Sequence, residues 1–334
     1  MANIQQVAQL AGVSTATVSR FLAGGRVRSA EAVAGALRQL DYRPSATARG
    51  LRTGRHMAVG VVVPDIANPF FAAVTWGIEN VIAPAGLQVA IANSGESVSH
   101  EADLVGELRR RVDGVILSPA TETDTVPKHL AASGIPVVFV DRKLRDSSDF
   151  DAVEVDNAAG AAAAANHLVD LGHRSIAMIS GPLSCTPGRE RHEGFLAALA
   201  ERQVEVDAAH VEIADFKESG GNTAMRRLLE TDDRPSAVFV ANNLMSIGAL
   251  KAIRETGLGI PQEISIIGFD DLDLGPLLDP PFTVIDRPTI AQGEAAGRLM
   301  LERLSDPRRP RQSLVMPVAL VRRASTAAPA GRAS

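Results

Sequence analysis

Four side chains close to the amino terminus have the chemistry needed to recognise DNA bases. Arg20 can bind a guanine through two hydrogen bonds or hold a phosphate, and Thr15 can hydrogen-bond to a base or touch a thymine methyl group. Ala16 can make only apolar contact, and Ser19 adds a hydroxyl. Because these residues lie between positions 15 and 20, a single helix could present them together. The sequence predicts base recognition if such a helix exposes them.

Residues 3–22 predict two short helices that would hold these side chains. Asn3 can cap the first helix, and the amide of Gln6, three residues later, can reach back to the cap. Gly12 can end this helix because glycine adopts a left-handed backbone at little cost, and Ser14 can cap the second helix. Two helices with a glycine-containing turn form a helix-turn-helix, whose second helix enters the major groove. A simple helical hairpin is the alternative at this point.

A longer pattern extends this motif over most of the chain. Its segments are Val7-Ala8, Leu10–Ser14 and Thr17–Arg20, then Asp41–Pro44, Ala48–Gly54, Val63–Phe71 and Gly268–Asp271. These segments resemble the LacI/GalR family of transcriptional regulators. The resemblance implies a homodimeric DNA-binding regulator, more often a repressor than an activator. Its affinity for a pseudopalindromic double-stranded operator would be controlled by a small-molecule effector.

Residues 44–52 resemble the hinge helix of that family, which becomes ordered on DNA and inserts a leucine, here Leu51, into the minor groove. Nine residues that include Gly50 are too few to be helical alone in water, so such a helix needs a partner. Arg49 and Arg52 could neutralise flanking phosphates. A flexible linker is the alternative. The candidate DNA-binding set is Thr15, Ala16, Thr17, Ser19, Arg20, Arg49, Leu51 and Arg52.

Charge is divided unevenly along the chain. The whole sequence of 334 residues carries a formal net charge of −5. Residues 1–56 hold eight arginines against Glu31 and Asp41, a net charge of +6, and the other residues hold 26 basic and 37 acidic side chains, a net charge of −11. This asymmetry is expected when only the amino-terminal part touches phosphate and the acidic remainder is kept away from DNA.

From Met57 onward, apolar strands alternate with helical stretches. The expected strands are 57–63, 87–92, 113–118, 136–140, 174–180, 209–213, 236–241 and 264–268, and the expected helices include 70–83, 158–171, 188–201, 218–230 and 243–256. Continuous apolar strands separated by helices predict parallel sheets covered on both faces, an α/β fold. Two such sets predict two doubly wound lobes that resemble periplasmic binding proteins. Segments 283–287 and 314–321 are expected to be strands that return to the first lobe.

The predicted organisation has four parts. A headpiece at 1–43, with a third helix from Ser29 to Leu40, is followed by a hinge and linker at 44–56, a two-lobed core at 57–322 and a disordered tail at 323–334. Lobe 1 is expected at about 57–156 and 287–316, and lobe 2 at about 157–286 and 317–322. The carboxyl-terminal segment has no heptad of leucines, so a homodimer is favoured over a tetramer.

The resemblance also assigns effector contacts to residues at the ends of predicted strands, where ligands bind in such folds. The set is Asn68, Phe70, Phe71, Asp141, Arg191, Phe216, Asn242 and Asp270. Amide, carboxylate and guanidinium groups around aromatic faces suit a sugar or another polyol, because each hydroxyl needs donor and acceptor partners. Phe70 and Phe71 could instead serve only core packing. Arg189 could replace Arg191, and Asn243 stands where many relatives have an aspartate.

Other classes of function find little support. The sequence has no glycine-rich dinucleotide loop after the first strand, no Gly-Lys-Ser/Thr phosphate loop and no Gly-x-Ser-x-Gly nucleophile motif, so we expect no cofactor and no catalytic residue. The single cysteine, Cys185, and the histidines lack metal-ligand spacing. No segment approaches the roughly 20 apolar residues of a membrane span, and the start of the chain is unlike a signal peptide.

We therefore expect a cytoplasmic, nucleoid-associated transcription factor that has no membrane partner. Two alternatives share parts of the pattern. A solute-binding protein of a sugar transporter would have the same two lobes but would need a secretion signal and no basic headpiece. An enzyme acting on a sugar could also use an α/β fold.

Overall fold

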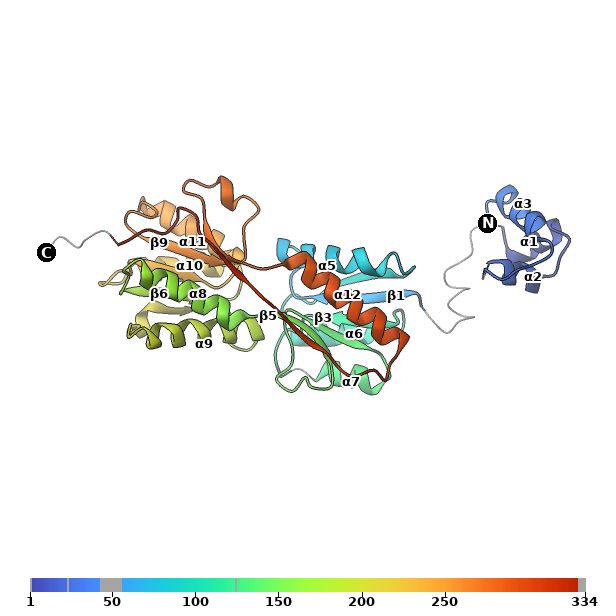
Figure 1. Ribbon diagram of the computed structural model, residues 1–334, viewed down its shortest axis with the longest axis horizontal. Helices are drawn as coiled ribbons and strands as arrows, with labels where there is room; N and C mark the ends of the chain where they lie inside the picture. The colour runs from blue at the N-terminus through green and yellow to red at the C-terminus, as the bar shows by residue number, and fades with distance from the viewer. Residues whose placement is uncertain (1, 23, 43–55, 124, 330–334) are drawn as a thin grey trace. The chain divides into compact units, whose positions relative to one another are not determined.

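The computed structural model describes residues 2–22, 24–42, 56–123 and 125–329 (Figure 1). Contacts divide the chain into two compact units, Met1–Met57 and Ala58–Ser334. We call residues 2–42 the headpiece and residues 58–329 the core. Among the described helices, none is long and apolar enough to cross a membrane.

The headpiece consists of α1 (Ile4–Leu10), α2 (Thr15–Leu22) and α3 (Ala30–Gln39). The predicted capping box at Asn3 is confirmed: its side chain accepts from the Gln6 N–H at 2.9 Å, and its own N–H donates to Gln6 Oε1 at 2.9 Å. Gly12 has the left-handed conformation, with φ +65°. Ser14 Oγ accepts from the Thr17 N–H at 3.2 Å. Local capping therefore fixes where α1 ends and α2 begins.

The headpiece core is small. Its buried apolar residues are Val7, Ala8, Val18, Val33 and Ala36, contributed by all three helices. Val18 is fully buried, so the opposite side of α2 is left open to solvent. The three-helix prediction is confirmed, and α3 begins one residue later and ends one residue earlier than expected.

The first sheet of the core is six-stranded and wholly parallel. Its order is β11 (Ser313–Met316), β5 (Asp151–Val155), β4 (Val137–Val140), β3 (Gly114–Leu117), β1 (Ala58–Val63) and β2 (Gln88–Asn93). One face packs on α5 (Pro69–Ile82) and α12 (Thr289–Ser305), and the other on α6 (Val98–Leu108) and α7 (Val126–Ala132). This sheet with its helices is lobe 1.

The second sheet is also six-stranded, and within it only β10 and β12 pair antiparallel. Its order is β12 (Ala319–Val321), β10 (Thr283–Asp286), β9 (Ser265–Phe269), β8 (Ala237–Val240), β6 (Ile176–Ser180) and β7 (Val211–Ile213). Its helices pack as two pairs: α8 (Asn157–Asp170) with α9 (Thr186–Glu201), and α10 (Glu218–Leu229) with α11 (Asn243–Thr256). Short 3-10 turns lie at Ala208–His210 and Gly275–Leu277. This is lobe 2, and the predicted doubly wound α/β class is confirmed (Figure 1).

Two strand assignments from the sequence were wrong. The segment predicted to return to lobe 1 at 283–287 forms β10, which pairs with β9 in lobe 2. The expected lobe bounds had placed 283–286 in lobe 2, and the chain crosses after Asp286. The segment 314–321 is divided: β11 joins lobe 1, and β12 joins lobe 2 after Pro317, which has no N–H to continue a ladder. An apolar run predicts a buried strand, but it does not say which sheet takes it.

Strand β5 was not predicted, because Asp151 and Glu154 interrupt its apolar pattern. Both carboxylates are buried and paired: Arg303 Nε lies 2.9 Å from Asp151 Oδ2, and Lys143 Nζ lies 2.5 Å from Glu154 Oε2. A buried charge is tolerated when a partner and hydrogen bonds compensate it. Arg303 is far from Asp151 in the sequence, so local reasoning could not predict this pair.

The prediction of a disordered tail from residue 323 was wrong for residues 323–329. Ser325 Oγ accepts from the Thr283 N–H at 2.8 Å and donates to the Ile266 carbonyl at 2.7 Å. The Ala327 carbonyl lies 2.8 Å from His173 Nε2. This short polar segment completes hydrogen bonds at the start of the lobe 2 strands, so its composition misled the prediction. Residues 330–334 lie outside the described part of the chain.

Candidate DNA-reading helix and effector pocket

Helix α2 presents most of the predicted base-reading side chains to solvent. Thr15, Ala16 and Arg20 are exposed, whereas Thr17 and Ser19 are partly buried. Thr17 Oγ1 lies 3.0 Å from Ser14 Oγ, so it supports the start of the helix. The other three candidates, Arg49, Leu51 and Arg52, lie outside the described residues.

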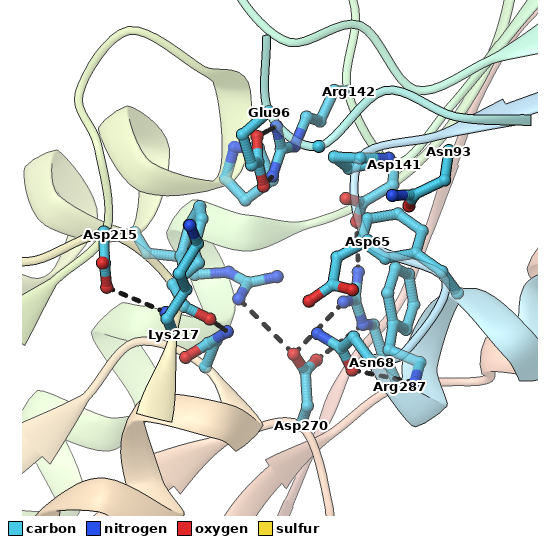
Figure 2. Close-up of a pocket in the computed structure, with 18 residues that line it drawn as sticks. Asp65, Asn68, Asn93, Glu96, Asp141, Arg142, Asp215, Lys217, Asp270 and Arg287 are labelled. Atoms are coloured by element: carbon cyan, nitrogen blue, oxygen red, sulfur yellow. Dashed lines mark hydrogen bonds and ion pairs between the residues drawn. The ribbon is translucent and has the colours of Figure 1, made fainter. Parts of the chain in front are cut away.

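The core contains a cavity of about 180 Å³ where the carboxyl ends of the strands of both lobes converge (Figure 2). All eight residues expected to contact an effector line it: Asn68, Phe70, Phe71, Asp141, Arg191, Phe216, Asn242 and Asp270. Several follow a strand directly, as Asp141 follows β4 and Asp270 follows β9. Parallel strands end at one edge of a sheet, which is why residues far apart in sequence meet here.

Two asparagines of the cavity also cap helices. Asn68 Oδ1 accepts from the Phe70 N–H at 3.0 Å at the start of α5, and Asn242 Oδ1 accepts from the Met245 N–H at 2.9 Å at the start of α11. Asn68 also exchanges two hydrogen bonds with the Asn243 amide of the other lobe, at 2.8 and 3.2 Å. The two helix starts therefore aim partial positive charge at the cavity, and one amide pair joins the lobes.

Four buried charges form the centre of the site. Arg287 Nη1 lies 2.5 Å from Asp141 Oδ1, and Arg287 Nε lies 2.6 Å from Asp270 Oδ1. Arg191 Nη1 lies 3.7 Å from Asp270 Oδ2. Figure 2 shows Arg287 between Asp141 and Asp270. Asp270 thus serves two guanidinium groups, and the four charges balance.

Arg191 is held by several groups yet keeps one free donor. Its Nε donates to Asn157 Oδ1 at 2.9 Å and its Nη1 donates to the Ala241 carbonyl at 2.6 Å. Its guanidinium carbon lies 3.5 Å from the centre of the Phe269 ring. Burial, aided by repulsion from Arg287, lowers the pKa of Arg191 to about 10, although Asp270 opposes this change. Among the described atoms, its buried Nη2 has no hydrogen-bond partner.

The backbone of the cavity is unusual for non-glycine residues. Glu96, Asp141, Phe216 and Asp270 all have left-handed conformations, with φ between +62° and +70°. This region is uncommon for a bulky residue such as phenylalanine, and each such residue costs on the order of 1–3 kcal/mol. Conformational strain concentrated around one cavity is a mark of a binding site, since the surrounding structure must maintain it.

The structure separates alternatives that the sequence left open. Arg191 lines the cavity, whereas Arg189 makes ion pairs with Glu122 of lobe 1, with Nη2 2.8 Å from Oε1. Phe70 and Phe71 line the cavity and also pack in the lobe 1 core. Asp270 lines the cavity, whereas the neighbouring Asp271 accepts a hydrogen bond from Arg323, at 2.7 Å between Nη1 and Oδ1.

Several charged or polar lining residues were not predicted: Asp65, Asn93, Glu96, Arg142, Asp215, Lys217 and Arg287. Asp65 and Arg142 are close in sequence to predicted residues, so position after a strand was a usable signal. Arg287 had none, because it was expected to lie inside a strand at 283–287 and not after the end of that strand. Among the described residues, no group of three or more histidine, cysteine or acidic side chains is placed to hold a metal. The arrangement can bind hydroxyl groups through matched donors and acceptors.

Models of known protein families match the headpiece and part of the core. A model of bacterial regulatory proteins of the lacI family matches residues 3–45, and a model of a periplasmic binding protein-like domain matches residues 165–326. The ribose operon repressor of Escherichia coli strain K12 is 34% identical over 331 residues, which cover 97% of this chain and 100% of the repressor.

Solved structures are similar over most of the chain. The lac repressor dimer bound to operator and the anti-inducer ONPF is 28% identical, with a TM-score of 0.88, over 98% of this chain and 99% of that one. A CelR–cellobiose complex is 31% identical, with a TM-score of 0.76, over 97% and 100%. A LacI family regulator from Enterococcus faecalis V583 with bound ribose is 30% identical, with a TM-score of 0.72, over 81% and 99%.

Proposed function

This chain belongs to the LacI family of bacterial regulatory proteins, and on that premise we propose that it represses transcription as a homodimer under the control of a sugar. It is a DNA-binding transcriptional regulator rather than an enzyme. The observation that carries the sugar proposal is the convergence of all eight expected residues on one cavity between the lobes.

The headpiece is proposed to place α2 in the major groove. Thr15, Ala16 and Arg20 would touch base edges, and Thr17 and Ser19 would support or contact the backbone. Two headpieces in a dimer read two half-sites, so the operator would be pseudopalindromic. We further propose that Leu51 wedges the central minor groove, with Arg49 and Arg52 on phosphates.

The effector is proposed to be a ribose-like sugar. The cavity offers the Phe216 and Phe71 rings, carboxylates and the free Nη2 of Arg191, a mixture that suits hydroxyl groups on an apolar ring face. The E. faecalis regulator binds ribose. This chain is similar to it over most of the core and is also similar to the regulator solved with cellobiose, so the comparisons support a sugar. The small cavity favours a single sugar ring.

Control of DNA binding requires that the sugar bind two lobe arrangements with different affinity. The polar contacts that join the lobes include the Asn68–Asn243 amide pair, the Glu122–Arg189 ion pair and the bridge made by Arg287. Burial alone would raise the pKa of Glu122, but hydrogen bonds from Arg189 and Arg145 outweigh burial and lower it. Glu122 therefore stays charged, and the lobes are held by polar contacts that a ligand can rearrange.

A homodimer is proposed from the similarity to the lac repressor dimer. Large apolar side chains are exposed on α5, at the start of α12 and on the loop after β9, namely Trp76, Ile290, Leu274 and Leu277. A second copy would cover such a surface. A repressor acts on the chromosome, so we also propose a cytoplasmic, nucleoid-associated location.

Fluorescence anisotropy with DNA from around the protein's own gene tests this function. We expect tight binding that weakens as salt rises, weak binding to random DNA, and a change in operator affinity on adding D-ribose. Equal affinity for operator and random DNA, with and without D-ribose, would contradict the proposal.

A further inference from the structure

Arg287 occupies an unusual place in the fold. It follows β10 of lobe 2 and precedes α12 of lobe 1, so it stands on a crossing between the lobes. Its side chain is only 3% exposed and points into the cavity, where Figure 2 shows it between Asp141 and Asp270. A long charged side chain is rarely buried without a specific partner.

The guanidinium group of Arg287 forms ion pairs with a carboxylate of each lobe. It reaches Asp141 Oδ1 at 2.5 Å in lobe 1, and Asp270 at 2.6 Å through Nε and 3.2 Å through Nη2 in lobe 2. Burial alone would lower the pKa of Arg287, but the two aspartates outweigh burial and raise it. The cation is therefore permanent, and both carboxylates have a strong charge-assisted partner without any ligand.

Arg287 also covers an aromatic face that a sugar ring could use. Its guanidinium carbon lies 3.5 Å from the centre of the Phe70 ring, a stacked cation–π contact. Guanidinium groups are planar, so this contact occupies one side of the ring. The space left in the cavity is about 180 Å³, below the roughly 300–1,000 Å³ of most small-molecule pockets.

The cavity keeps open hydrogen-bonding atoms beside this contact. Arg191 Nη2, Arg287 Nε and Asp270 Oδ1 are buried without a hydrogen-bond partner among the described atoms, and Phe216 lines the same cavity. A single sugar ring could fill the remaining space and bond to these atoms. A second ring would have to displace the Arg287 guanidinium from Phe70 and break its bonds to Asp141 and Asp270.

We propose that Arg287 is a specificity-determining residue that limits the effector to a single sugar ring by occupying the Phe70 face and both carboxylates. This inference rests on the proposed function, because it assumes a sugar in this cavity. It goes beyond that function by assigning size selection to one side chain of this chain.

The test compares D-ribose and cellobiose by calorimetry on the full chain. Wild-type protein should bind D-ribose and should bind cellobiose at least about 100-fold more weakly. Arg287→Gln keeps an amide donor near the aspartates but frees the Phe70 face, so the preference for D-ribose should fall at least about tenfold, within the usual range for size discrimination. Arg298→Gln, on the exposed side of α12, is the matched control and should keep the wild-type preference.

A second variant guards against loss of folding. Arg287→Lys keeps a cation for the aspartates but has no planar group for Phe70, and it should also lower the preference for D-ribose. Thermal unfolding of each variant identifies any that fails to fold. If either folded variant keeps the wild-type preference, the role of Arg287 is overturned while the proposed function stands. If wild type and all variants bind neither sugar, the sugar effector itself is contradicted, and the role of Arg287 falls with it.

Discussion

The candidate DNA-reading helix and the candidate effector pocket are built in opposite ways. The candidate base contacts on α2 come from positions 15–20 and include three exposed side chains. The pocket is lined by segments spread from Pro64 to Arg287, and its central charges are buried. Base edges are contacted by solvent-exposed side chains, whereas a small ligand is bound by polar groups that are already buried and fixed in position. Neighbouring residues can encode the exposed helix surface, whereas the pocket requires residues that are distant in sequence.

The two regions also differ in what holds them together. The headpiece has a core of a few small apolar residues, with Val7, Val18 and Val33 fully buried. The pocket lies between two large cores and is crossed by ion pairs and an amide pair. Substitutions in the pocket should therefore affect stability and binding together, whereas substitutions on α2 should affect DNA binding alone.

The largest effect is expected from Asp270→Ala. Removing this carboxylate leaves Arg287 and Arg191 buried with too little negative charge, which costs about 3–5 kcal/mol of stability in comparable buried pairs. D-ribose binding measured by calorimetry should fall by more than about 100-fold, a loss of more than about 2.7 kcal/mol. Asp271→Ala is the matched control, because Asp271 pairs with Arg323 outside the cavity. Ribose affinity that is equal in wild type and Asp270→Ala would remove Asp270 from the pocket's binding groups.

Arg20→Ala should give the next largest effect, and it should be confined to DNA. A bidentate contact to guanine is worth about 1–3 kcal/mol of discrimination, so the preference for operator over random DNA should fall by about 5- to 150-fold. Anisotropy with both DNAs measures this loss. Calorimetry with D-ribose should show no change, and Arg202→Ala on the surface of the core should leave operator binding intact. Unchanged discrimination would show that Arg20 does not read bases.

Lowering the pH should reduce the thermal stability of the core but not that of the headpiece, and this effect should be smaller than those of the two substitutions. Burial lowers the pKa values of His167 and His173 from the ordinary value of 6.5. A group whose pKa is lowered on folding stabilises the fold above the unfolded value, and this stability is lost as the pH falls below about 6.5. Residues 2–42, which form the headpiece, contain no histidine. Thermal unfolding from pH 7.5 to pH 5 should therefore show a falling midpoint for the core and a constant one for the headpiece.

A histidine variant tests the cause of this pH dependence. Glu154 should oppose this fall in stability. Burial raises its pKa, so its contribution to the stability of the fold increases as the pH falls. His173→Gln can still meet Ser236 and the Ala327 carbonyl, so it should fold and show a flatter dependence on pH. An equally steep fall in the variant would place the effect elsewhere.

The smallest effect is expected from Asn243→Asp. The change keeps an acceptor for Asn68 Nδ2 but removes the donor to Asn68 Oδ1, a loss of about 0.5–1.5 kcal/mol for one hydrogen bond. Residue 243 begins α11, where a negative charge is favoured, so part of the loss should be recovered. Ribose affinity should change by less than about tenfold. A loss above 100-fold would show that this amide pair, rather than Arg287, dominates the junction between the lobes.

Much of the headpiece and of the pocket could be predicted before the structure. Capping by Asn3, the glycine turn at Gly12 and the cap at Ser14 depend on neighbours within four residues, and all were found as expected. The eight cavity residues were predicted because they follow strands and match a family pattern. The late strands were not placed consistently: 283–287 and 314–321 were expected in lobe 1, whereas the lobe bounds put 283–286 and 317–322 in lobe 2, since an apolar run carries the same signal in either sheet.

The sequence by itself determined the local elements, the alternation that gives two parallel sheets, and the uneven charge that marks the DNA-binding end. Tertiary structure alone decided which long-range charges meet. Asp151 with Arg303, Glu122 with Arg189, and Arg287 between Asp141 and Asp270 are pairs that only the fold brings together. The physical reason is that periodicity records whether a side chain is buried, whereas a buried charge also requires a partner that is distant in the chain and close in space.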